Sequence, residues 1–219
     1  MKIEQSGRYN TKEFTEGNFE PGSKNRVYKN LLSITKKRKM DELEYQELIK
    51  TTTKLFNEFD ENHRFKISDI KKIHKMWLGK IFTWAGKYRQ INLSKGGFHF
   101  AAADQISKLM TELEKKELKK YTPCRFDSLE KIIEAIAIVH TELVLIHPFR
   151  EGNGRVARLV ATLMALQAGL PVLDFGGLKG KKRQEYFMAV RAGLNGQYGP
   201  MMKIFKSVIK RTLKKYQSE

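Results

Sequence analysis

Residues 147–158 read HPFREGNGRVAR, and the rest of the chain is expected to fold around this stretch. A long apolar segment precedes it, and a second one, rich in Ala and Leu, follows it. Pro148 disfavours helical geometry at His147, so a helix formed by the first segment should end there. The second helix should begin near Asn153 or Gly154. The stretch is therefore predicted to be a loop between two helices.

Arg155 and Arg158 then fall in the first turn of the second helix, which is an unfavourable place for cations. The N-terminus of a helix carries partial positive charge, and each misplaced cation costs ~0.3–1 kcal/mol. Two such costs in one turn indicate that another interaction stabilises the two arginines there. An anion held between backbone amides and guanidiniums would supply it, as phosphates bind at helix N-termini that follow Gly-containing loops.

The other side chains of the stretch suit the transfer of a nucleotide phosphate. His147 is a candidate general base, because imidazole titrates near neutral pH. Glu151 would repel a phosphate unless a cation intervened, and Mg²⁺ bound by a carboxylate and by phosphate oxygens is the usual solution. Phe149 is apolar within a polar loop, so it is expected to anchor the loop in the core.

The second half of the stretch provides the expected anion site. Gly152, Asn153 and Gly154 allow the backbone to turn its amides toward an anion. Arg155 and Arg158 are suited to bidentate recognition of phosphate. The alternative is a helix–loop–helix turn with scattered polar residues, and the density of chemically apt groups favours the anion site.

The stretch resembles the signature HxFx[DE]GNGRxxR of Fic-domain proteins and matches it at all eight specified positions. The resemblance extends from YKNLLSIT at Tyr28 through WAGKYR at Trp84 to the C-terminal helix. It implies a mostly α-helical Fic-fold bundle with a small β-hairpin flap over the active site. Residues 1–30 would form an irregular N-terminal arm, and residues 31–219 the Fic domain, with 147–158 as its core motif.

The resemblance also implies a reaction, in which AMP moves from ATP to a Ser, Thr or Tyr hydroxyl of a target protein and pyrophosphate leaves. By position, His147 would take the hydroxyl proton, and Glu151 would hold Mg²⁺ on the α- and β-phosphates. The amides of residues 152–154 would stabilise the phosphates. Arg155 would contact the β-phosphate side, and Arg158 the γ-phosphate.

Alternatives to this reaction remain open. The related Doc kinases carry a lysine where this chain has Gly154 and bind ATP reversed to phosphorylate, so Gly154 favours adenylylation. The same fold could use another nucleotide or diphosphate donor. The chain could also be a non-enzymatic basic binding module, because its net charge is +18. Such a charge suits nucleic acid, but without a known nucleic-acid-binding motif this partner is not expected.

The apolar alternation of residues 88–94 and 98–100 predicts a two-stranded hairpin, which is marginal unless it packs on helices. Its exposed edge could pair with an extended peptide, or the hairpin could be structural only. The resemblance favours the first reading, because Fic proteins place such a flap over the active site and dock target segments against it. The docking residues would be Lys95, Gly96, Gly97 and Phe98.

Helical periodicity predicts most of the remaining chain. Residues 40–59 should form a helix, Ser68 should cap the next one, and Asp127 with Glu130 resembles a capping box. His74 lies within an apolar stripe and should be a hydrogen-bonded core histidine. The inward face of the helix over residues 40–59 should comprise Leu43, Leu48, Leu55, Phe56 and Phe59.

Length and composition indicate one sizeable core in 219 residues, 41% of them hydrophobic. Cys124 is the single cysteine, which excludes an intramolecular disulfide and fits a reducing compartment. Neither a secretory signal nor a membrane span is expected, because no long apolar run occurs. A cytoplasmic location is the expectation, and a secreted effector stays an alternative.

Control of the activity can also be read from the sequence. Many Fic proteins carry an inhibitory helix with the pattern [ST]xxxE[GN], whose glutamate pairs with the second motif arginine, here Arg158. Glu16, Glu61 and Glu151 are each followed by Gly or Asn, but none has Ser or Thr at the required earlier position. The chain thus resembles the class in which a separate small antitoxin protein supplies the glutamate. A degenerate internal inhibitor formed by Glu16 or Glu61 is the alternative.

Overall fold

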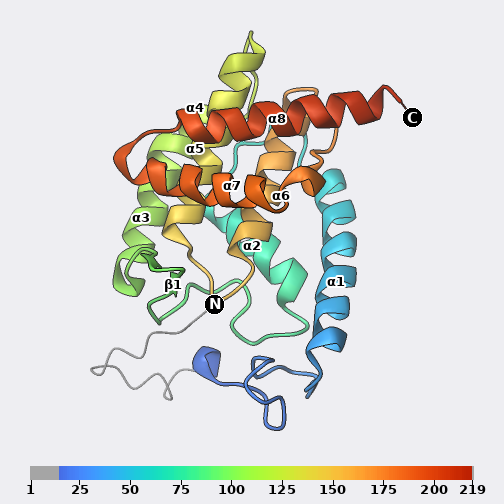
Figure 1. Ribbon diagram of the computed structural model, residues 1–219, viewed down its shortest axis with the longest axis vertical. Helices are drawn as coiled ribbons and strands as arrows, with labels where there is room; N and C mark the ends of the chain where they lie inside the picture. Colours follow the sequence, from blue (N-terminus) through green and yellow to red (C-terminus); the bar gives the residue numbers. More distant parts are fainter. Residues whose placement is uncertain (1–14, 219) are drawn as a thin grey trace. The chain divides into compact units, whose positions relative to one another are not determined.

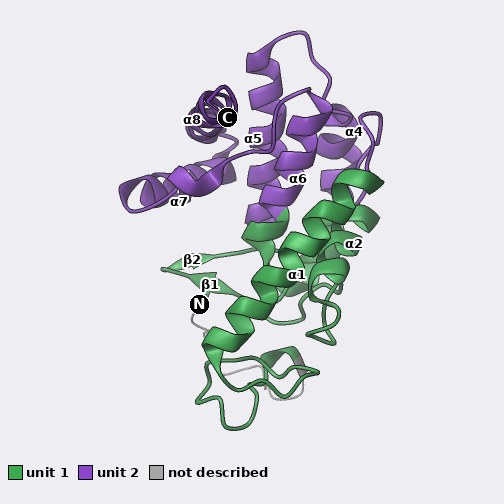
Figure 2. Ribbon diagram, turned by 90° about the vertical axis from the view of Figure 1, so that its right-hand side faces the viewer, with its two compact units in different colours: residues 1–58, 67–110, 147–156 green, residues 59–66, 111–146, 157–219 purple. Residues whose placement is uncertain are grey.

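A computed structural model describes residues 15–218 of the chain (Figure 1). The described residues form two compact units, each discontinuous in sequence (Figure 2). Unit 1 lies within residues 1–58, 67–110 and 147–156, and unit 2 within residues 59–66, 111–146 and 157–219. Both units are mainly helical, and the described strands form one two-stranded hairpin, which confirms the predicted fold class.

The elements are as follows. Those of unit 1 are η2 (Thr15–Gly17), α1 (Lys37–Glu58), α2 (Ile67–Leu78), β1 (Ser94–Lys95), β2 (Phe98–His99) and η3 (Ala103–Gln105). Those of unit 2 are η4 (Glu114–Leu118), α4 (Lys119–Tyr121), α5 (Leu129–Ile146), η5 (Phe175–Gly177), α7 (Lys181–Ala192), η6 (Gly193–Asn195) and α8 (Gly199–Tyr216). Residues of α3 (Ile106–Leu113) and α6 (Asn153–Gln167) belong to both units.

In unit 1, α1 packs against α2 with a different face from the predicted one. Of the five residues predicted to point inward, only Leu55 is buried, and the others are half-buried. The carboxylates of Glu44 and Glu47 have cationic partners, so the helix can bury a stripe that includes them. The buried residues of α1 are Met40, Glu44, Glu47, Thr51 and Leu55.

The starts of two helices differ slightly from the sequence prediction. Helix α2 begins at Ile67, so Ser68 lies inside its first turn instead of capping it. At the start of α5, the Ser128 hydroxyl accepts a hydrogen bond from the Lys131 amide at 3.3 Å. The cap is therefore Ser128 and not Asp127. Ser and Asp cap helices about equally well, so sequence alone does not choose between neighbouring candidates.

The predicted hairpin is present but shorter than expected. Ser94 pairs with His99 and Lys95 with Phe98, so the ladder spans two residues on each strand. Gly96 and Gly97 form the turn with φ values of +56° and +71°, a conformation that strongly favours glycine at both positions. Residues 88–93 of the predicted first strand are not in the ladder.

In unit 2, α5 packs against α7 and α8. A Cβ atom at Gly193 would lie 2.3 Å from Cγ2 of Thr141, so glycine permits a close approach of η6 to α5. His140 on α5 is fully enclosed between the Ala157 carbonyl and the Tyr186 hydroxyl, and burial lowers its pKa to about 3. None of the described helices has the length and apolar character needed to cross a membrane.

The described part of the predicted N-terminal arm has little regular structure but many contacts. Phe19 and Tyr28 form an isolated antiparallel bridge, and their rings stack at 5.2 Å. The Asn30 side chain donates to the Ile34 carbonyl and accepts from its amide, both at 3.0 Å. Residues 1–14 of the predicted arm lie outside the described residues.

Candidate functional site

Residues 147–152 form a tight loop between α5 and α6, as predicted. Gly152 has a φ of +84°, and a Cβ atom there would lie 2.5 Å from Cζ3 of Trp77. The buried Asn153 side chain closes the loop, because its oxygen accepts from the Phe149 amide at 2.8 Å and its nitrogen donates to the Phe149 carbonyl at 2.7 Å. The loop is thus fixed by its own sequence and by Trp77 of α2.

Phe149 and His74 join the loop to α2. Phe149 is fully buried, and its ring stacks on His74 at 3.9 Å between centroids. Nδ1 of His74 accepts the Gly86 amide at 2.7 Å, so the proton lies on Nε2, which donates to the Glu151 carbonyl at 3.1 Å. Burial lowers the pKa of His74 to about 4, which keeps the ring neutral. This is the hydrogen-bonded core histidine that was predicted, and it supports the loop directly.

His147 lies half-buried at the start of the loop, with a positive φ of +52°. Its ring stacks on Phe100 at 3.7 Å. Its carbonyl accepts a hydrogen bond from Nε of Arg89 at 2.8 Å. The residue is therefore held through both its ring and its backbone, which defines where the imidazole lies.

Arg89 is a buried cation that sequence reasoning did not assign to the site. Its Nη1 donates to the Ile91 carbonyl at 2.6 Å, and its Nη2 to the Ala101 carbonyl at 2.5 Å. Its own amide donates to the Pro148 carbonyl at 2.8 Å. Arg89 thus bonds to backbone carbonyls before and after the hairpin and to the backbone of the motif loop. Its presence in the WAGKYR segment was the available signal.

Arg150 is a second buried cation behind the loop. It occupies a position that the Fic signature leaves unspecified. Its Nε donates to the Glu16 carbonyl at 2.8 Å, and its guanidinium lies 4.1 Å from the Tyr28 ring centroid. The Glu16 carboxylate accepts the amides of Gln90 and Ile91 at 2.6 and 3.1 Å. The described N-terminal residues thus support the loop.

Arg155, in the first turn of α6, contacts three groups of unit 1. Its Nη1 donates to Oε2 of Glu44 at 2.9 Å, and its Nη2 lies 3.6 Å from Oε1 of Glu151. Its guanidinium carbon is 4.4 Å from the Trp77 ring centroid. Glu44 therefore supplies part of the compensation that the sequence had assigned to a bound anion. Sequence reasoning missed Glu44, because a carboxylate within a helical stripe shows no sign of its distant partner.

Glu151 fits one part of a magnesium site. Its side chain is 34% exposed, and Oε1 accepts the Gly152 amide at 3.0 Å. Among the described residues, no group of three or more His, Cys, Asp or Glu side chains could hold a metal. Mg²⁺ commonly binds one or two carboxylates together with substrate phosphates. Glu151 together with the phosphate oxygens of a nucleotide would make such a donor set.

The other predicted site residues divide between the two units. Lys95, Gly96 and Gly97 are exposed at the hairpin tip. Phe98 is half-buried, and its ring lies 5.3 Å from Phe100, which in turn stacks on His147. Unit 1 thus brings together the hairpin, the catalytic candidate and residues 149–155. Arg158 belongs to unit 2, where its guanidinium carbon lies 5.9 Å from the Phe175 ring centroid.

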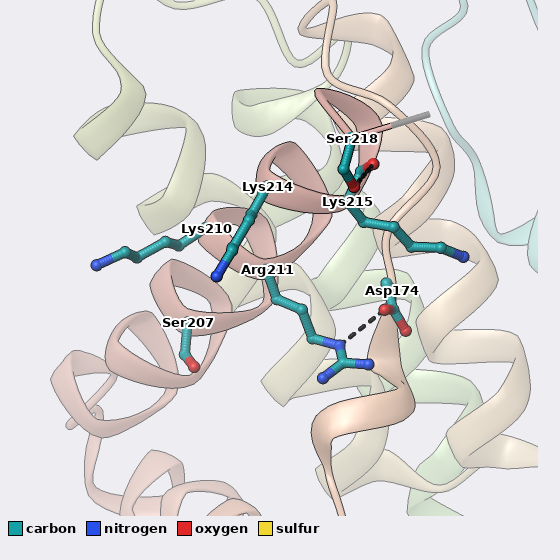
Figure 3. A pocket seen from close by; sticks show the side chains of 7 residues that line it. All are labelled: Asp174, Ser207, Lys210, Arg211, Lys214, Lys215 and Ser218. Atoms are coloured by element: carbon teal, nitrogen blue, oxygen red, sulfur yellow. Dashed lines mark hydrogen bonds and ion pairs between the residues drawn. The ribbon is translucent and has the colours of Figure 1, made fainter.

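A basic groove of about 460 Å³ lies along α8 in unit 2 and contains none of the predicted site residues (Figure 3). Nε of Arg211 donates to Oδ2 of Asp174 at 2.7 Å, which partly neutralises the groove. The lining residues are Asp174, Ser207, Lys210, Arg211, Lys214, Lys215 and Ser218. Solvent-exposed lysines of this kind are typical of a solvated helix face.

Comparison with known proteins agrees with the motif. Residues 64–165 match the model of the Fic/DOC family. This match includes the whole motif at residues 147–158. The predicted resemblance to Fic-domain proteins is therefore confirmed.

Two curated relatives are named protein adenylyltransferases. Protein adenylyltransferase fic-1 of Caenorhabditis briggsae is 28% identical over 157 residues, which cover 71% of this chain and 29% of that protein. Protein adenylyltransferase VbhT of Bartonella schoenbuchensis is 29% identical over 153 residues, which cover 70% and 30%. The match with this chain thus spans less than a third of the length of either relative.

A crystal structure of the BepC protein of Bartonella tribocorum, with bound AMPPNP, has the same fold. The TM-score is 0.66, the sequence identity is 24%, and the alignment covers 83% of this chain and 91% of that one. At this identity the similarity shows the fold alone.

Proposed function

We propose that this chain is a protein adenylyltransferase that transfers AMP from ATP to a Ser, Thr or Tyr hydroxyl of a target protein. The main support is the loop of unit 1 together with the first turn of α6, which combine the half-buried groups of His147, Glu151 and Arg155 with one buried anchor, Phe149. The names of the curated relatives point to the same reaction. Labelling of a target protein from α-labelled ATP but not from γ-labelled ATP tests this proposal.

In this proposal, His147 takes the proton from the attacking hydroxyl. The hydroxyl oxygen forms a bond to the α-phosphorus, the bond from that phosphorus to the bridging oxygen breaks, and pyrophosphate leaves. Stacking on Phe100 and the hydrogen bond from Arg89 to the His147 carbonyl keep the imidazole in place for this step. A general base held in position in this way typically contributes ~10²–10⁴ to the rate.

The phosphates would be bound by the rest of the motif. Glu151 would hold Mg²⁺, which neutralises charge on the α- and β-phosphates when bound. The amides of residues 152–154 would donate to phosphate oxygens at the start of α6. Arg155 would contact the β-phosphate side, and Arg158 the γ-phosphate. Gly154 provides no side-chain cation, which favours transfer of AMP over transfer of the γ-phosphate.

The hairpin would dock the target segment by its exposed edge. Replacing Gly97 by Pro is expected to reduce target modification much more than ATP affinity. Proline requires a φ near −65°, whereas Gly97 has +71°, and proline also removes a backbone donor. The same change at Gly196, which has a φ of +68° in unit 2, is a matched control. An equal loss of ATP affinity and transfer rate in Gly97→Pro would exclude a docking role.

Control by a separate small antitoxin protein is part of the proposal. Neither internal candidate glutamate is held as an inhibitory residue would need to be. The Glu16 carboxylate is buried against the Gln90 and Ile91 amides, and Glu61 pairs with Arg125. We expect Glu61→Gly and Glu16→Gln to leave the rate of self-adenylylation within about twofold of wild type. A large rise in either variant would show that the inhibitor is internal.

A further inference from the structure

Glu44 is a buried carboxylate for which the proposed mechanism has no role. It lies on α1, in the stripe that faces the core of unit 1, and its side chain is 8% exposed. Burial raises its pKa, and the nearby Arg155 guanidinium opposes that rise. A carboxylate in such a place usually has a specific partner. Here that partner is the first arginine of the motif, which lies on α6.

Glu44 contacts both Arg155 and the Trp77 ring against which Arg155 packs. Its side chain accepts Nη1 of Arg155 at 2.9 Å. Its backbone carbonyl accepts Nε1 of Trp77 at 2.8 Å, and Arg155 stacks over that same indole at 4.4 Å. Trp77 is fully buried and leaves no room for a Cβ atom at Gly152, which would lie 2.5 Å from its ring. One residue of α1 therefore orients the arginine and the ring on which it rests.

The two edges of the Arg155 guanidinium differ in their surroundings. Nη1 donates a hydrogen bond to the buried carboxylate of Glu44. Nη2 lies 3.6 Å from the carboxylate of Glu151, whose side chain is 34% exposed. The Glu44 contact is a short, charge-assisted hydrogen bond, and the Glu151 contact is longer than one. The Nη2 edge is therefore the one that a bound anion can reach without displacing a buried group.

We propose that Glu44 is a positioning residue that fixes Arg155 against Trp77, so that the Nη2 edge of the guanidinium is preset for the phosphates of a nucleotide. The proposal rests on the proposed function for the identity of the anion. It assigns Glu44 no contact with substrate. It also gives α1 a role in the site, which the Fic signature does not include.

The alternative is that Glu44 competes with phosphate for Arg155 and acts as a brake. Its burial argues against this, because a competitor must withdraw into solvent when the nucleotide binds. Helix α1 is packed on α2, and the Glu44 backbone is tied to Trp77. The pair is therefore a fixed part of unit 1, and a phosphate would add to it and not replace it.

Calorimetry on a series of Glu44 variants distinguishes a positioning residue from a competitor of phosphate. The measured quantities are the affinities for ATP, ADP and AMP in the presence of Mg²⁺. Gln at position 44 keeps the reach of the side chain and loses the charge, Asp keeps the charge and loses the reach, and Ala loses both. Positioning predicts that Glu44→Ala and Glu44→Asp weaken ATP and ADP binding by roughly 10–100-fold, with a smaller loss in Glu44→Gln. AMP, which lacks the β-phosphate, should bind almost unchanged.

Glu47→Ala is the matched control. Glu47 lies one turn along the same buried face of α1 and pairs with Lys50 at 2.7 Å, away from Arg155. The Glu47→Ala variant should bind ATP, ADP and AMP with wild-type affinity. An ATP affinity that rises in Glu44→Ala and Glu44→Gln would establish the brake and overturn the proposal. An equal loss for ATP, ADP and AMP would also overturn it, because only the fold would then depend on Glu44.

A second measurement needs no nucleotide. Nitrogen NMR of the Arg155 guanidinium should show slow rotation in the wild type and in Glu47→Ala, and fast rotation in Glu44→Ala. Rotation that is equally fast in the wild type would overturn positioning. A wild-type chain that binds no nucleotide but shows slow Arg155 rotation would contradict the proposed function and leave the role of Glu44 intact.

Discussion

Replacing His147 by alanine is expected to lower the rate of AMP transfer by ~10²–10⁴ while leaving ATP affinity and thermal stability nearly unchanged. The hydrogen bond from Arg89 ends on the His147 backbone carbonyl, so it survives the substitution. The buried anchor at Phe149 is also untouched. The change therefore removes the imidazole and keeps the loop that carries it.

Single-turnover rates and calorimetric ATP affinities of the same preparations check this expectation. His63→Ala is the control, because it removes a histidine of unit 2 that packs against Phe59 and Phe65. That variant should transfer AMP at the wild-type rate. If His147→Ala also does so, His147 is not the general base.

Replacing Glu151 by glutamine should weaken the binding of Mg-ATP by roughly 10–100-fold, the size expected for losing a charged contact. The substitution removes the charge and keeps the shape. The Glu151 carbonyl still accepts from His74, so the loop should keep its path. Binding of ATP without metal should not weaken, because without a cation the Glu151 carboxylate repels the phosphates and the substitution removes that repulsion.

Calorimetry with and without Mg²⁺ measures both affinities in one protein. Glu112→Gln offers a matched control, because the Glu112 carboxylate is 42% exposed and pairs with Lys116 at 3.5 Å. It should leave both affinities at their wild-type values. Equal Mg-ATP affinities for Glu151→Gln and wild type would contradict the role of Glu151 as the metal carboxylate.

The local part of the site could be predicted from the sequence. Pro148 and the glycines of the motif fix the loop between α5 and α6, and the apolar Phe149 within a polar stretch is buried. These features depend on neighbouring residues, so they leave a mark in the order of amino acids. The helices follow from periodicity for the same reason.

The supporting contacts could not be predicted, because they join residues far apart in sequence. Arg155 and Glu44 are 111 positions apart, and Arg150 meets the Glu16 carbonyl across 134 positions. A buried charge with a distant partner has no periodic sign. The face of α1 was predicted wrongly for this reason, since carboxylates on a helix are normally expected to face water.

The length of the hairpin shows a related limit. Alternating residues from 88 to 94 predicted a strand, but the ladder has only two pairs, and the Arg89 side chain donates to the Ile91 and Ala101 carbonyls. The contacts of this buried side chain leave no mark in the alternation of apolar residues. The same side chain donates to the His147 carbonyl, so one buried cation links the residues around the hairpin to the catalytic candidate.

The most direct test of the proposed reaction compares two labels on ATP. The purified chain is incubated with Mg²⁺, a cell lysate and ATP labelled at either the α- or the γ-phosphate, and proteins are separated under denaturing conditions. Adenylyl transfer predicts a protein band labelled from α-labelled ATP and unlabelled from γ-labelled ATP, with no band for His147→Ala. A band labelled only from the γ-phosphate would establish phosphorylation instead. That result, or the absence of any labelled protein with the wild type, would contradict the proposal.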